Sequence, residues 1–501
     1  MEQKAVKLNV ENLSSLPKAV KVPGYDRSKI KTGIVHVGIG GFHRAHQAFY
    51  TDQLLELGVT DWGICGIALL QHDKKIYDTL VGQNGLYTLM ITEADGTRTA
   101  RVIGSVTEYL FAPENPNAVI EKMAHPDTKI ITLTITEGGY NFNPATGKFM
   151  ADNPAIQTDL KNPDRPATIF GYLAQALKRR KQRGLQGITL QSCDNIQQNG
   201  AVAKEMLLAY IALAEPELLN WVNENVSFPN AMVDRITPVT SPEAIAELQD
   251  QFQVEDAWPV VCEPFCQWII EDDFVNGRPD WNLVGAQFVK DVHPYEKMKI
   301  RLVNGGHVAL GFTGFLNGYH FVDETMADPL FFNFVHDFLD QEVTPILDEV
   351  PGIDIKAYKK ILMQRFANPY IKDQLARIFS ESSAKIPKFL LPTIQEQLAK
   401  GVTLKKAALI LAAWCHYLEI AGLPANNFDV QDDMKKTLVK EASASVQEDP
   451  LAFLKIKPIF GDLAASENFS AQYLFFLNII RKEGIAKAIS GIDGEKQVTA
   501  N

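Results

Sequence analysis

The segment that most constrains the fold of this chain is residues 33–57. Its first part, residues 33–38 (GIVHVG), is apolar and β-branched, a composition that favours a strand. Its last part, residues 47–57, has apolar side chains at helical spacing: Phe49, Tyr50, Leu54 and Leu55. Glycines lie between the two parts. A strand, a glycine turn and a helix in this order predict the first unit of an open α/β sheet.

The turn contains Gly38, Gly40 and Gly41. A Gly-x-Gly pair lets the backbone turn tightly and approach a pyrophosphate, which would rest on the N-terminus of the following helix. The third glycine of the usual dinucleotide fingerprint is missing, because position 43 is His. The strand-to-helix context strengthens an otherwise weak motif. We therefore expect these three glycines to contact a dinucleotide.

Three other residues near this unit are candidate cofactor contacts. Arg44 is unfavourable in the first turn of a helix unless an anion lies nearby, so either a bound phosphate or simple solvation would explain it. Phe42 could touch the cofactor or pack in the core. Asp73 follows the second expected strand, residues 62–70, where an acid can accept hydrogen bonds from the ribose of NAD and repel the extra phosphate of NADP. We expect NAD as the cofactor.

Strand and helix patterns alternate through residue 215. Further strands are expected at 86–92, 99–109, 129–136 and 187–192, with a hairpin around Asp95-Gly96, and helices at 167–183 and 199–214. This alternation predicts a Rossmann-type, doubly wound and mainly parallel sheet.

Polar residues follow two of these strands and interrupt a third apolar segment. Glu137 follows the strand at 129–136, and Asn195 follows the strand at 187–192. Open α/β sheets bind ligands at the carboxyl ends of their strands. Asp234 and Arg235 lie inside an apolar segment, where charges are usually paired or functional. These positions are candidate site residues.

From Tyr295 onward the apolar spacing is predominantly helical, with helices expected at 330–347, 355–366, 370–379, 385–399, 404–421, 430–444 and 467–489. We therefore predict two domains: an α/β domain at residues 1–288 and a mainly α-helical domain at residues 289–501.

The first helix of the second domain contains the sequence KIRLVNGGH at residues 299–307. At 100° per residue, Asn304 lies about 140° and His307 about 80° from Lys299, so an amine, an amide and an imidazole share one face. Gly305 and Gly306 each cost about 1 kcal/mol against Ala in a helix, which suggests that something comes close to the backbone there. This layout suits removal of a proton from an alcohol; a surface Lys and a packed His are the alternative.

Composition narrows the function classes. The net charge of −11 disfavours nonspecific binding to nucleic acid or to an anionic membrane. The longest apolar run, residues 407–415, is too short to span a membrane, and residues 1–15 lack the apolar core of a signal peptide. Five sparse cysteines indicate reduced thiols in a cytoplasmic protein. Cys262 and Cys266 alone make a poor zinc site, so no metal is expected.

Six motifs in order give the chain its resemblance to a known family: IVHVGIGGFHRAH (34–46), TEGGY (136–140), SCDNIQQNG (192–200), MVDRITP (232–238), EPFCQWIIEDDF (263–274) and the Lys299, Asn304, His307 arrangement. Over nearly its whole length the chain resembles the polyol-specific long-chain dehydrogenases, the mannitol dehydrogenase family.

This resemblance implies a role for each matching residue. Lys299 would be the general base in alcohol oxidation. Asn195 and Asn304 would polarise the reacting oxygen, His307 would bind and orient the substrate, and Glu137 would relay protons to solvent. The positions that match substrate contacts are Asp234, Arg377 and Lys385. The resemblance also implies NAD and no metal.

Oxidation of a secondary alcohol requires a base for the hydroxyl proton and an acceptor for the hydride. A lysine serves as base near neutral pH only if burial or nearby positive charge lowers its pKa. D-mannitol and D-fructose are the leading substrate pair. D-arabinitol and the hexuronates fructuronate and tagaturonate remain alternatives within the family, and a catalytically inactive NAD-binding sensor is the alternative outside it. The oligomeric state is open, and the family includes many monomers.

Overall fold

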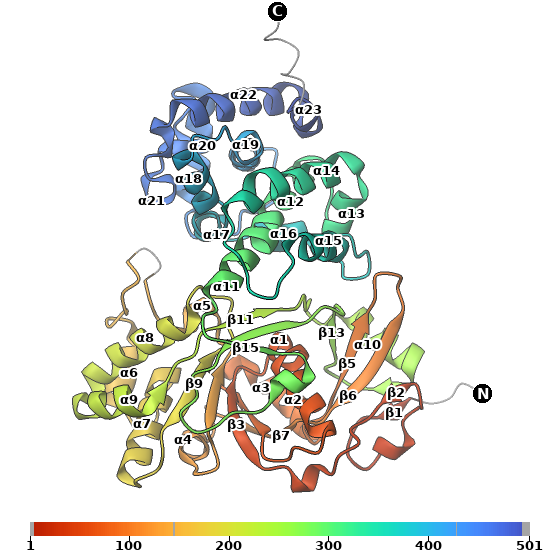
Figure 1. Cartoon of the computed structure of the whole chain (residues 1–501), viewed down its shortest axis with the longest axis vertical. Helices are drawn as coiled ribbons and strands as arrows, with labels where there is room; N and C mark the ends of the chain where they lie inside the picture. The colour runs from red at the N-terminus through yellow and green to blue at the C-terminus, as the bar shows by residue number, and fades with distance from the viewer. Residues whose placement is uncertain (1–4, 144–145, 427, 493–501) are drawn as a thin grey trace, which may run out of the picture. The chain divides into compact units, whose positions relative to one another are not determined.

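The computed structural model describes residues 5–143, 146–426 and 428–492. The chain divides into two compact units, Met1–His293 and Pro294–Asn501 (Figure 1). The division falls five residues beyond the end expected for the first domain at 288, because the connecting chain runs on to the helix α11 (His293–Lys299).

The centre of the first unit is a six-stranded sheet in the order β10-β9-β8-β3-β4-β7, with every neighbouring pair parallel. Its strands are β3 (Thr32–Val37), β4 (Gly63–Ala68), β7 (Val106–Phe111), β8 (Ile130–Leu133), β9 (Ile188–Ser192) and β10 (Val226–Ser227). Numbered along the chain and read from β7, the order is 3-2-1-4-5-6, that of a dinucleotide-binding sheet. The predicted doubly wound parallel sheet is confirmed.

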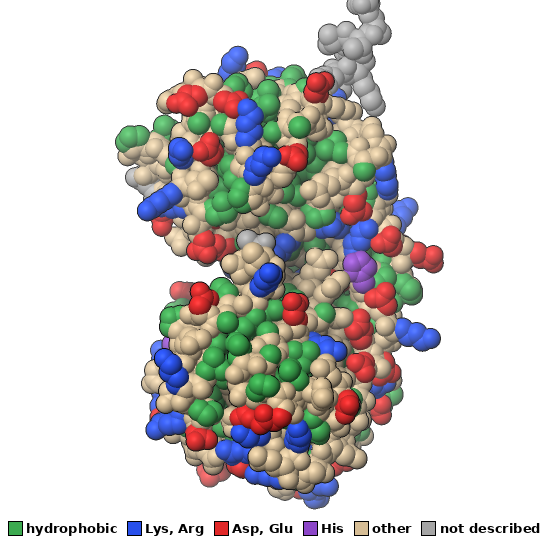
Figure 2. Space-filling model, turned by 90° about the vertical axis from the view of Figure 1, so that its left-hand side faces the viewer, with side chains coloured by type: hydrophobic (Ala, Val, Ile, Leu, Met, Phe, Trp, Pro, Cys, Tyr) green, Lys and Arg blue, Asp and Glu red, His purple; other side chains and the backbone are tan. Residues whose placement is uncertain are grey.

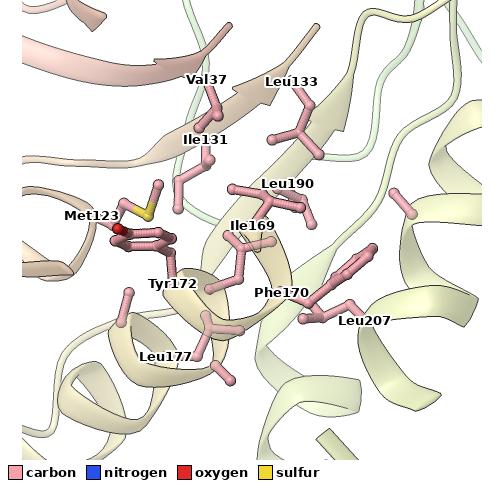
Figure 3. Close-up of a cluster of buried hydrophobic side chains, with 14 of the residues drawn as sticks. Val37, Met123, Ile131, Leu133, Ile169, Phe170, Tyr172, Leu177, Leu190 and Leu207 are labelled. Carbon is pink, nitrogen blue, oxygen red and sulfur yellow. The ribbon is translucent and has the colours of Figure 1, made fainter. Parts of the chain in front are cut away.

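Alternate residues of each central strand enter two different cores. In β3, Val35 and Val37 join one cluster of buried side chains and Ile34 joins another. This alternation arises because successive side chains of a strand point to opposite faces. Figure 3 shows the first cluster, where Val37, Ile131, Leu133 and Leu190 meet side chains of α4 (Pro116–Ala124), α7 (Ile169–Gln182) and α8 (Asn199–Ala214). Burial on both faces explains why these strands are almost wholly apolar.

The other strands of this unit form smaller sheets. They are β1 (Val6–Lys7) with β12 (Val254–Glu255), the order β11-β14-β15 (Ala231–Asp234, Gln267–Glu271 and Gln287–Val289), and the order β13-β5-β6-β2 (Val260–Cys262, Tyr87–Thr92, Arg98–Ile103 and Val20–Lys21). The expected hairpin is present, since β5 and β6 pair antiparallel around the turn.

The single strand expected at 99–109 is wrong, because β6 ends at Ile103 and β7 begins at Val106 in a different sheet. A buried carboxylate holds the break: Asp52 accepts a hydrogen bond from the Gly104 amide at 2.9 Å and from Arg101 at 2.6 Å. A long-range partner therefore divides a segment that reads locally as one strand.

The second unit is helical. Its helices are α11, α12 (Gly305–Leu316), α13 (Val322–Ala327), α14 (Pro329–Phe338), α15 (Ile355–Phe366), α16 (Leu375–Phe379), α17 (Ser382–Phe389), α18 (Leu391–Ala399), α19 (Lys405–Ala421), α20 (Lys435–Gln447), α21 (Lys457–Phe460), α22 (Glu467–Glu483) and α23 (Ile485–Ser490). The predicted mainly α-helical domain is confirmed. Several expected helices are shorter or divided, such as α22 and α23, which Gly484 separates with a φ of 87°.

Helix α19 is the most buried helix of this unit and contains the long apolar run of the sequence. The carboxylate of Glu342 accepts hydrogen bonds from the backbone amides of Lys406 and Ala407, both at 2.8 Å. A negative charge at a helix N-terminus is favourable, and here it comes from a distant residue. Desolvation by burial nevertheless raises the pKa of Glu342. Among the described residues, no helix has both the length and the apolar character needed to cross a membrane.

The surface carries charges of both signs. On the face drawn in Figure 2, the Lys and Arg side chains are interspersed with Asp and Glu, and no large area of that face is of one sign. This distribution agrees with the mild acidity of the whole chain.

Candidate functional site

The glycine turn lies at the carboxyl end of β3, beside the end of β8. Gly38 has a φ of 100°, and a Cβ added there would lie 2.1 Å from the backbone oxygen of Thr134. Only glycine allows this left-handed conformation and this close approach of two strand ends. Strands β3 and β8 flank the point where the strand order reverses, which is where such sheets bind dinucleotides.

Gly40 and Gly41 differ from Gly38. Gly40 is exposed with a φ of −69°, and an added Cβ would meet nothing within 4 Å. A Cβ on Gly41 would make only an ordinary contact with Thr237, at 3.6 Å. Gly40 caps the short helix α1 (Gly41–Ala45), so open space lies above backbone amides at this turn. This space fits a group that must approach the main chain closely.

A buried histidine supports the turn from beneath. The Nε2 atom of His36 lies 2.8 Å from the Gly38 carbonyl oxygen and 2.9 Å from the Thr134 hydroxyl, while Nδ1 lies 2.7 Å from the Thr132 hydroxyl. Its ring stacks on His43, with centroids 3.4 Å apart. Burial lowers the pKa of His36 to about 3, so the ring is neutral. A histidine within an otherwise apolar strand was the sequence signal for this support.

Arg44 does not reach the surface. Its side chain is 1% exposed, donates a hydrogen bond to the Trp258 carbonyl at 2.7 Å and lies over the Tyr87 ring at 5.1 Å. Both expectations for Arg44, a phosphate contact and simple solvation, are therefore wrong. A backbone carbonyl and an aromatic ring inside the domain contact the guanidinium, whose buried Nε has no hydrogen-bond partner among the described residues, and no sequence pattern identified these contacts.

The other two candidates lie near the surface. Phe42 is half-buried and stacks on the buried ring of His46, with centroids 4.9 Å apart. Asp73 ends a short 3-10 helix beyond β4, and its carboxylate accepts a hydrogen bond from the Leu70 amide at 2.9 Å. Its side chain is 23% exposed, and its other carboxylate oxygen lies 3.6 Å from the Nε2 atom of His72.

Glu137 and Asn195 follow the neighbouring strands β8 and β9, and both side chains are exposed. Strand β8 is shorter than expected, ending at Leu133, so Glu137 lies in the short helix α5 (Thr136–Gly139). The carboxylate of Asp194 joins the two segments by accepting hydrogen bonds from the amides of Ile135 and Thr136 at 3.0 and 2.9 Å.

Asp234 ends β11 and is 6% exposed. Its neighbour Arg235 is also buried and donates hydrogen bonds to the carbonyls of Ala45 and Glu263, at 2.6 and 3.0 Å. The charges inside this apolar segment are therefore engaged, as their burial required. The Arg235 contact fixes the end of α1 against β11.

In the second unit, Lys299, Asn304 and His307 lie on one continuous helical run that is interrupted by a π-turn at Ile300–Asn304. The amide of Gly305 donates to the carbonyl of Ile300, five residues earlier. A π-turn holds more residues per turn than an α-helix, so Lys299 and Asn304 are closer in angle than the α-helical spacing predicted. Such turns occur frequently at functional sites.

The side chains on this run differ in exposure. Lys299 is 6% exposed, whereas Asn304 and His307 are half-buried. The buried side-chain oxygen of Asn304 accepts no hydrogen bond from the described residues. The ring of His307 packs on Phe366, with centroids 4.6 Å apart. The prediction that a glycine here permits a close approach is confirmed, because a Cβ on Gly306 would lie 2.9 Å from that same ring.

A buried cation anchors the π-turn. Arg301 is 7% exposed and donates to the Lys388 carbonyl at 2.7 Å, with Glu396 at 3.8 Å. On the preceding turn, Lys297 reaches the same Glu396 at 3.1 Å. These contacts attach the helix that carries Lys299 to α17 and α18.

Arg377 and Lys385 are both engaged by the protein. Arg377 makes a bidentate pair with the buried carboxylate of Asp373, at 2.8 and 2.6 Å. The ammonium of Lys385 lies within hydrogen-bond distance of the carbonyls of Arg377 and Ile378 and of the Ser380 hydroxyl. An ammonium has three donors, so Lys385 must exchange one of these contacts to bind a substrate.

Among the described residues, no group of three or more His, Cys, Asp or Glu side chains has the geometry of a metal site. All five cysteines are free thiols. Cys262 ends β13 and Cys266 precedes β14, so the two do not lie on one helix face.

Comparisons with known proteins identify the family. A model of the mannitol dehydrogenase Rossmann domain matches residues 32–283, and a model of the mannitol dehydrogenase C-terminal domain matches residues 291–475. The chain belongs to the mannitol dehydrogenase family. The first match lies within the first compact unit, and the second begins three residues before the second unit, which starts at Pro294.

Individual members of the family match along almost their whole length. A mannitol 2-dehydrogenase from Neosartorya fischeri is 47% identical over 496 residues, which cover 97% of this chain and 98% of that protein. The solved structure of Pseudomonas fluorescens mannitol 2-dehydrogenase, a ternary complex with NAD and D-mannitol, is 45% identical with a TM-score of 0.87, covering 97% and 99% of the two chains. A D-sorbitol dehydrogenase in substrate-free form is 37% identical with a TM-score of 0.88, covering 96% and 100%.

Two residues of this member of the mannitol dehydrogenase family were not singled out from the sequence. His36 holds the glycine turn, and Asp194 holds the segments that carry Glu137 and Asn195. Asp194 was visible in the sequence as a carboxylate directly before Asn195, after a buried strand. Its hydrogen-bond partners lie about 60 residues away and could not be read from local pattern.

Proposed function

We propose that this protein is an NAD-dependent polyol dehydrogenase that interconverts D-mannitol and D-fructose. The observation that carries the proposal is the match along nearly the whole chain to Pseudomonas fluorescens mannitol 2-dehydrogenase, whose structure is a ternary complex with NAD and D-mannitol. The named relatives from Neosartorya fischeri and Aspergillus fumigatus support the same activity.

The glycine turn fits a dinucleotide. Gly38 brings the ends of β3 and β8 together, and Gly40 leaves open space above exposed backbone at the switch point of the sheet. In this proposal Gly38, Gly40 and Gly41 hold the pyrophosphate and Asp73 accepts from a ribose hydroxyl. When bound, NAD accepts the hydride. The buried Arg44 takes no part in holding it, whereas Phe42 remains a candidate contact.

Each polar residue has a proposed chemical task. Lys299 is the general base that removes the hydroxyl proton during oxidation and returns it during ketose reduction. The amides of Asn195 and Asn304 donate hydrogen bonds to the reacting oxygen, which stabilises the charge that develops on it. His307 orients the substrate, and the exposed Glu137 passes the proton to solvent.

The substrate-contacting residues are Asp234, Arg377 and Lys385. Arg377 is the more accessible of the two cations, with 59% of its side chain exposed, and its guanidinium retains donors beyond the two that contact Asp373. Metal-independence belongs to the proposal as well, because the lysine supplies the base that a metal-bound hydroxide would otherwise provide.

The proposal is tested by a spectrophotometric panel with NADH and NADPH, with and without a chelator. The substrates are D-fructose, D-xylulose, D-fructuronate and D-tagaturonate. We expect turnover of D-fructose with NADH that the chelator does not change. Preference for a uronate would overturn the mannitol assignment and make Arg377 or Lys385 the carboxylate ligand. NADH binding without turnover of any substrate would support the inactive sensor instead.

Variants of two lysines on the same helix test the general base. Lys299→Met should lower kcat by about 10²- to 10⁴-fold, the usual contribution of a general base, while NADH binding is retained. Lys297→Met is the matched control, because Lys297 lies two residues earlier and contacts Glu396 and Asp348. A Lys299→Met enzyme as active as the Lys297→Met enzyme would refute the assigned role.

We also propose a cytoplasmic location and a monomeric state. Five free cysteines, four of them buried, support a reducing compartment. Light scattering of the purified protein tests the monomer, and fractionation of the source cells tests the location.

A further inference from the structure

One carboxylate in the first unit is placed to control two of the proposed catalytic residues together. Asp194 is 9% exposed and follows the last residue of β9, Ser192, by two positions. Its two oxygens accept hydrogen bonds from the amide of Ile135 at 3.0 Å, the amide of Thr136 at 2.9 Å and the hydroxyl of Tyr140 at 2.7 Å. All three donors belong to the segment that follows the neighbouring strand β8.

The backbone that Asp194 holds is strained. Thr136 has a φ of 60°, a left-handed conformation that is rare and unfavourable for a β-branched residue. Such a conformation persists only where its surroundings enforce it, and it is found preferentially at functional sites. The Asp194 hydrogen bond goes to the amide of this strained residue, immediately before Glu137.

Buried hydrogen bonds also hold the segment that follows β9. The side chain of Asn199 donates to the Asp194 carbonyl at 3.0 Å and to the Ala231 carbonyl at 2.7 Å, and it accepts from the Ala231 amide at 2.9 Å. The Tyr140 hydroxyl also lies 2.6 Å from the Ser192 hydroxyl. The segment that contains the exposed Asn195 therefore starts and ends in buried hydrogen bonds.

We infer that Asp194 is a positioning residue that holds Glu137 and Asn195 in one arrangement by tying the chain after β9 to the chain after β8. This inference rests on the proposed function for the roles of Glu137 and Asn195. Asp194 contacts neither substrate nor cofactor in this scheme and acts only through the two segments that it joins. A single substitution should then displace both polar groups at once.

Asp159 provides a matched control. It is fully buried in the same unit and also accepts two backbone amides and one hydroxyl: Ala167 at 2.7 Å, Thr168 at 2.9 Å and the Thr168 hydroxyl at 2.5 Å. It lies on α6 (Pro154–Lys161), away from the strand ends. In both Asp→Asn variants the new amide NH₂ would face backbone N–H donors, so the two variants lose comparable hydrogen bonds. Only the Asp194 substitution lies beside proposed catalytic residues.

The experiment compares the full-length Asp194→Asn and Asp159→Asn enzymes well below their melting temperatures. Asp194→Asn should lower kcat for D-mannitol by on the order of 10- to 100-fold, the effect of a misplacement near 1 Å, with little change in the KM for NAD. Hydrogen exchange at residues 134–140 should accelerate in this variant and stay unchanged in Asp159→Asn. In a Glu137→Gln, Asn195→Ala background, adding Asp194→Asn should lower kcat no further.

Each other outcome is decisive. Equal kcat losses in the two Asn variants, or unchanged exchange at residues 134–140, would overturn the inference. A wild-type enzyme without polyol activity would refute the proposed function, and the exchange comparison alone would then decide whether Asp194 is a clamp. If Asp194→Asn does not fold, Tyr140→Phe removes one of the three donors: a smaller kcat loss with faster exchange supports the clamp, and unchanged values refute it.

Discussion

Replacing Gly40 with alanine should separate cofactor binding from stability. Gly40 has a φ of −69°, which alanine adopts freely, and its added Cβ would meet no atom within 4 Å. The free energy of unfolding should therefore change by no more than about 0.5 kcal/mol. If a pyrophosphate approaches the backbone there, the new methyl group occupies the space it needs. Such overpacking costs about 1–3 kcal/mol, which weakens NADH binding by about 5- to 150-fold.

Two other glycines serve as controls for this variant. Gly38→Ala should destabilise the fold by at least about 2 kcal/mol, from the left-handed φ of 100° and the 2.1 Å approach to the Thr134 oxygen. Gly82, at the end of α3 (Lys74–Gly82), also has nothing within 4 Å of an added Cβ, but it lies in an ordinary surface helix. Gly82→Ala should leave both stability and binding near the wild-type values.

The assay is a fluorescence titration of NADH together with urea unfolding of each variant. The expected pattern is weak binding with normal stability for Gly40→Ala, and low stability for Gly38→Ala. A Gly40→Ala protein that binds NADH within about twofold of wild type, with a ΔΔG near 0.4 kcal/mol, would refute the idea that the cofactor approaches this backbone.

Three further predictions follow from the same structure. Gly306→Ala should lower the free energy of unfolding by about 1–3 kcal/mol, because the added Cβ meets Phe366 at 2.9 Å, whereas Gly305→Ala, with its nearest atom at 3.5 Å, should be neutral or stabilising in urea unfolding; equal effects would contradict this. Burial lowers the pKa of His46 from 6.5 to about 4, so between these values only the unfolded chain binds the proton. His46 should therefore contribute about 1.4 kcal/mol per pH unit to the fall in the free energy of unfolding on acidification, in addition to the contribution of the buried His36. The profile of His46→Gln should be shallower by that amount, and a profile parallel to that of the wild type would disprove the prediction. Lys385→Gln should raise the KM for D-mannitol about tenfold, the loss of a charged hydrogen bond; a lower melting temperature at unchanged KM would restrict Lys385 to a structural role.

The sequence alone was sufficient to predict the fold class and the family. The strand, glycine turn and helix at residues 33–57 depend on local preferences and side-chain periodicity, which act over a few residues. The buried runs of the parallel strands are apolar throughout because both faces are covered, so they were recognisable without tertiary information. The requirement for glycine at Gly38 is also local, since only glycine takes a φ of 100° readily.

Only the tertiary structure decided where the side chains of these elements point. Arg44 looked like a phosphate ligand, but Trp258 and Tyr87 from distant segments bury it. The segment at 99–109 read as one strand, but the Asp52 carboxylate divides it between two sheets. Each outcome depends on a partner far away in the chain, and neither periodicity nor propensity carries that information.

The arrangement of the candidate site shows the same division. Lys299, Asn304 and His307 were expected on one helical face from their spacing. The π-turn that brings Lys299 and Asn304 nearer in angle forms because the Gly305 amide bonds to the carbonyl of Ile300, five residues earlier, and the sequence pattern did not predict this bond. The sequence likewise placed Glu137 and Asn195 after strands, whereas the Asp194 clamp that joins them exists only because β8 and β9 are neighbours. The identity of the candidate site residues could therefore be predicted from local sequence, whereas their positions relative to one another depend on contacts between segments that are distant in the chain.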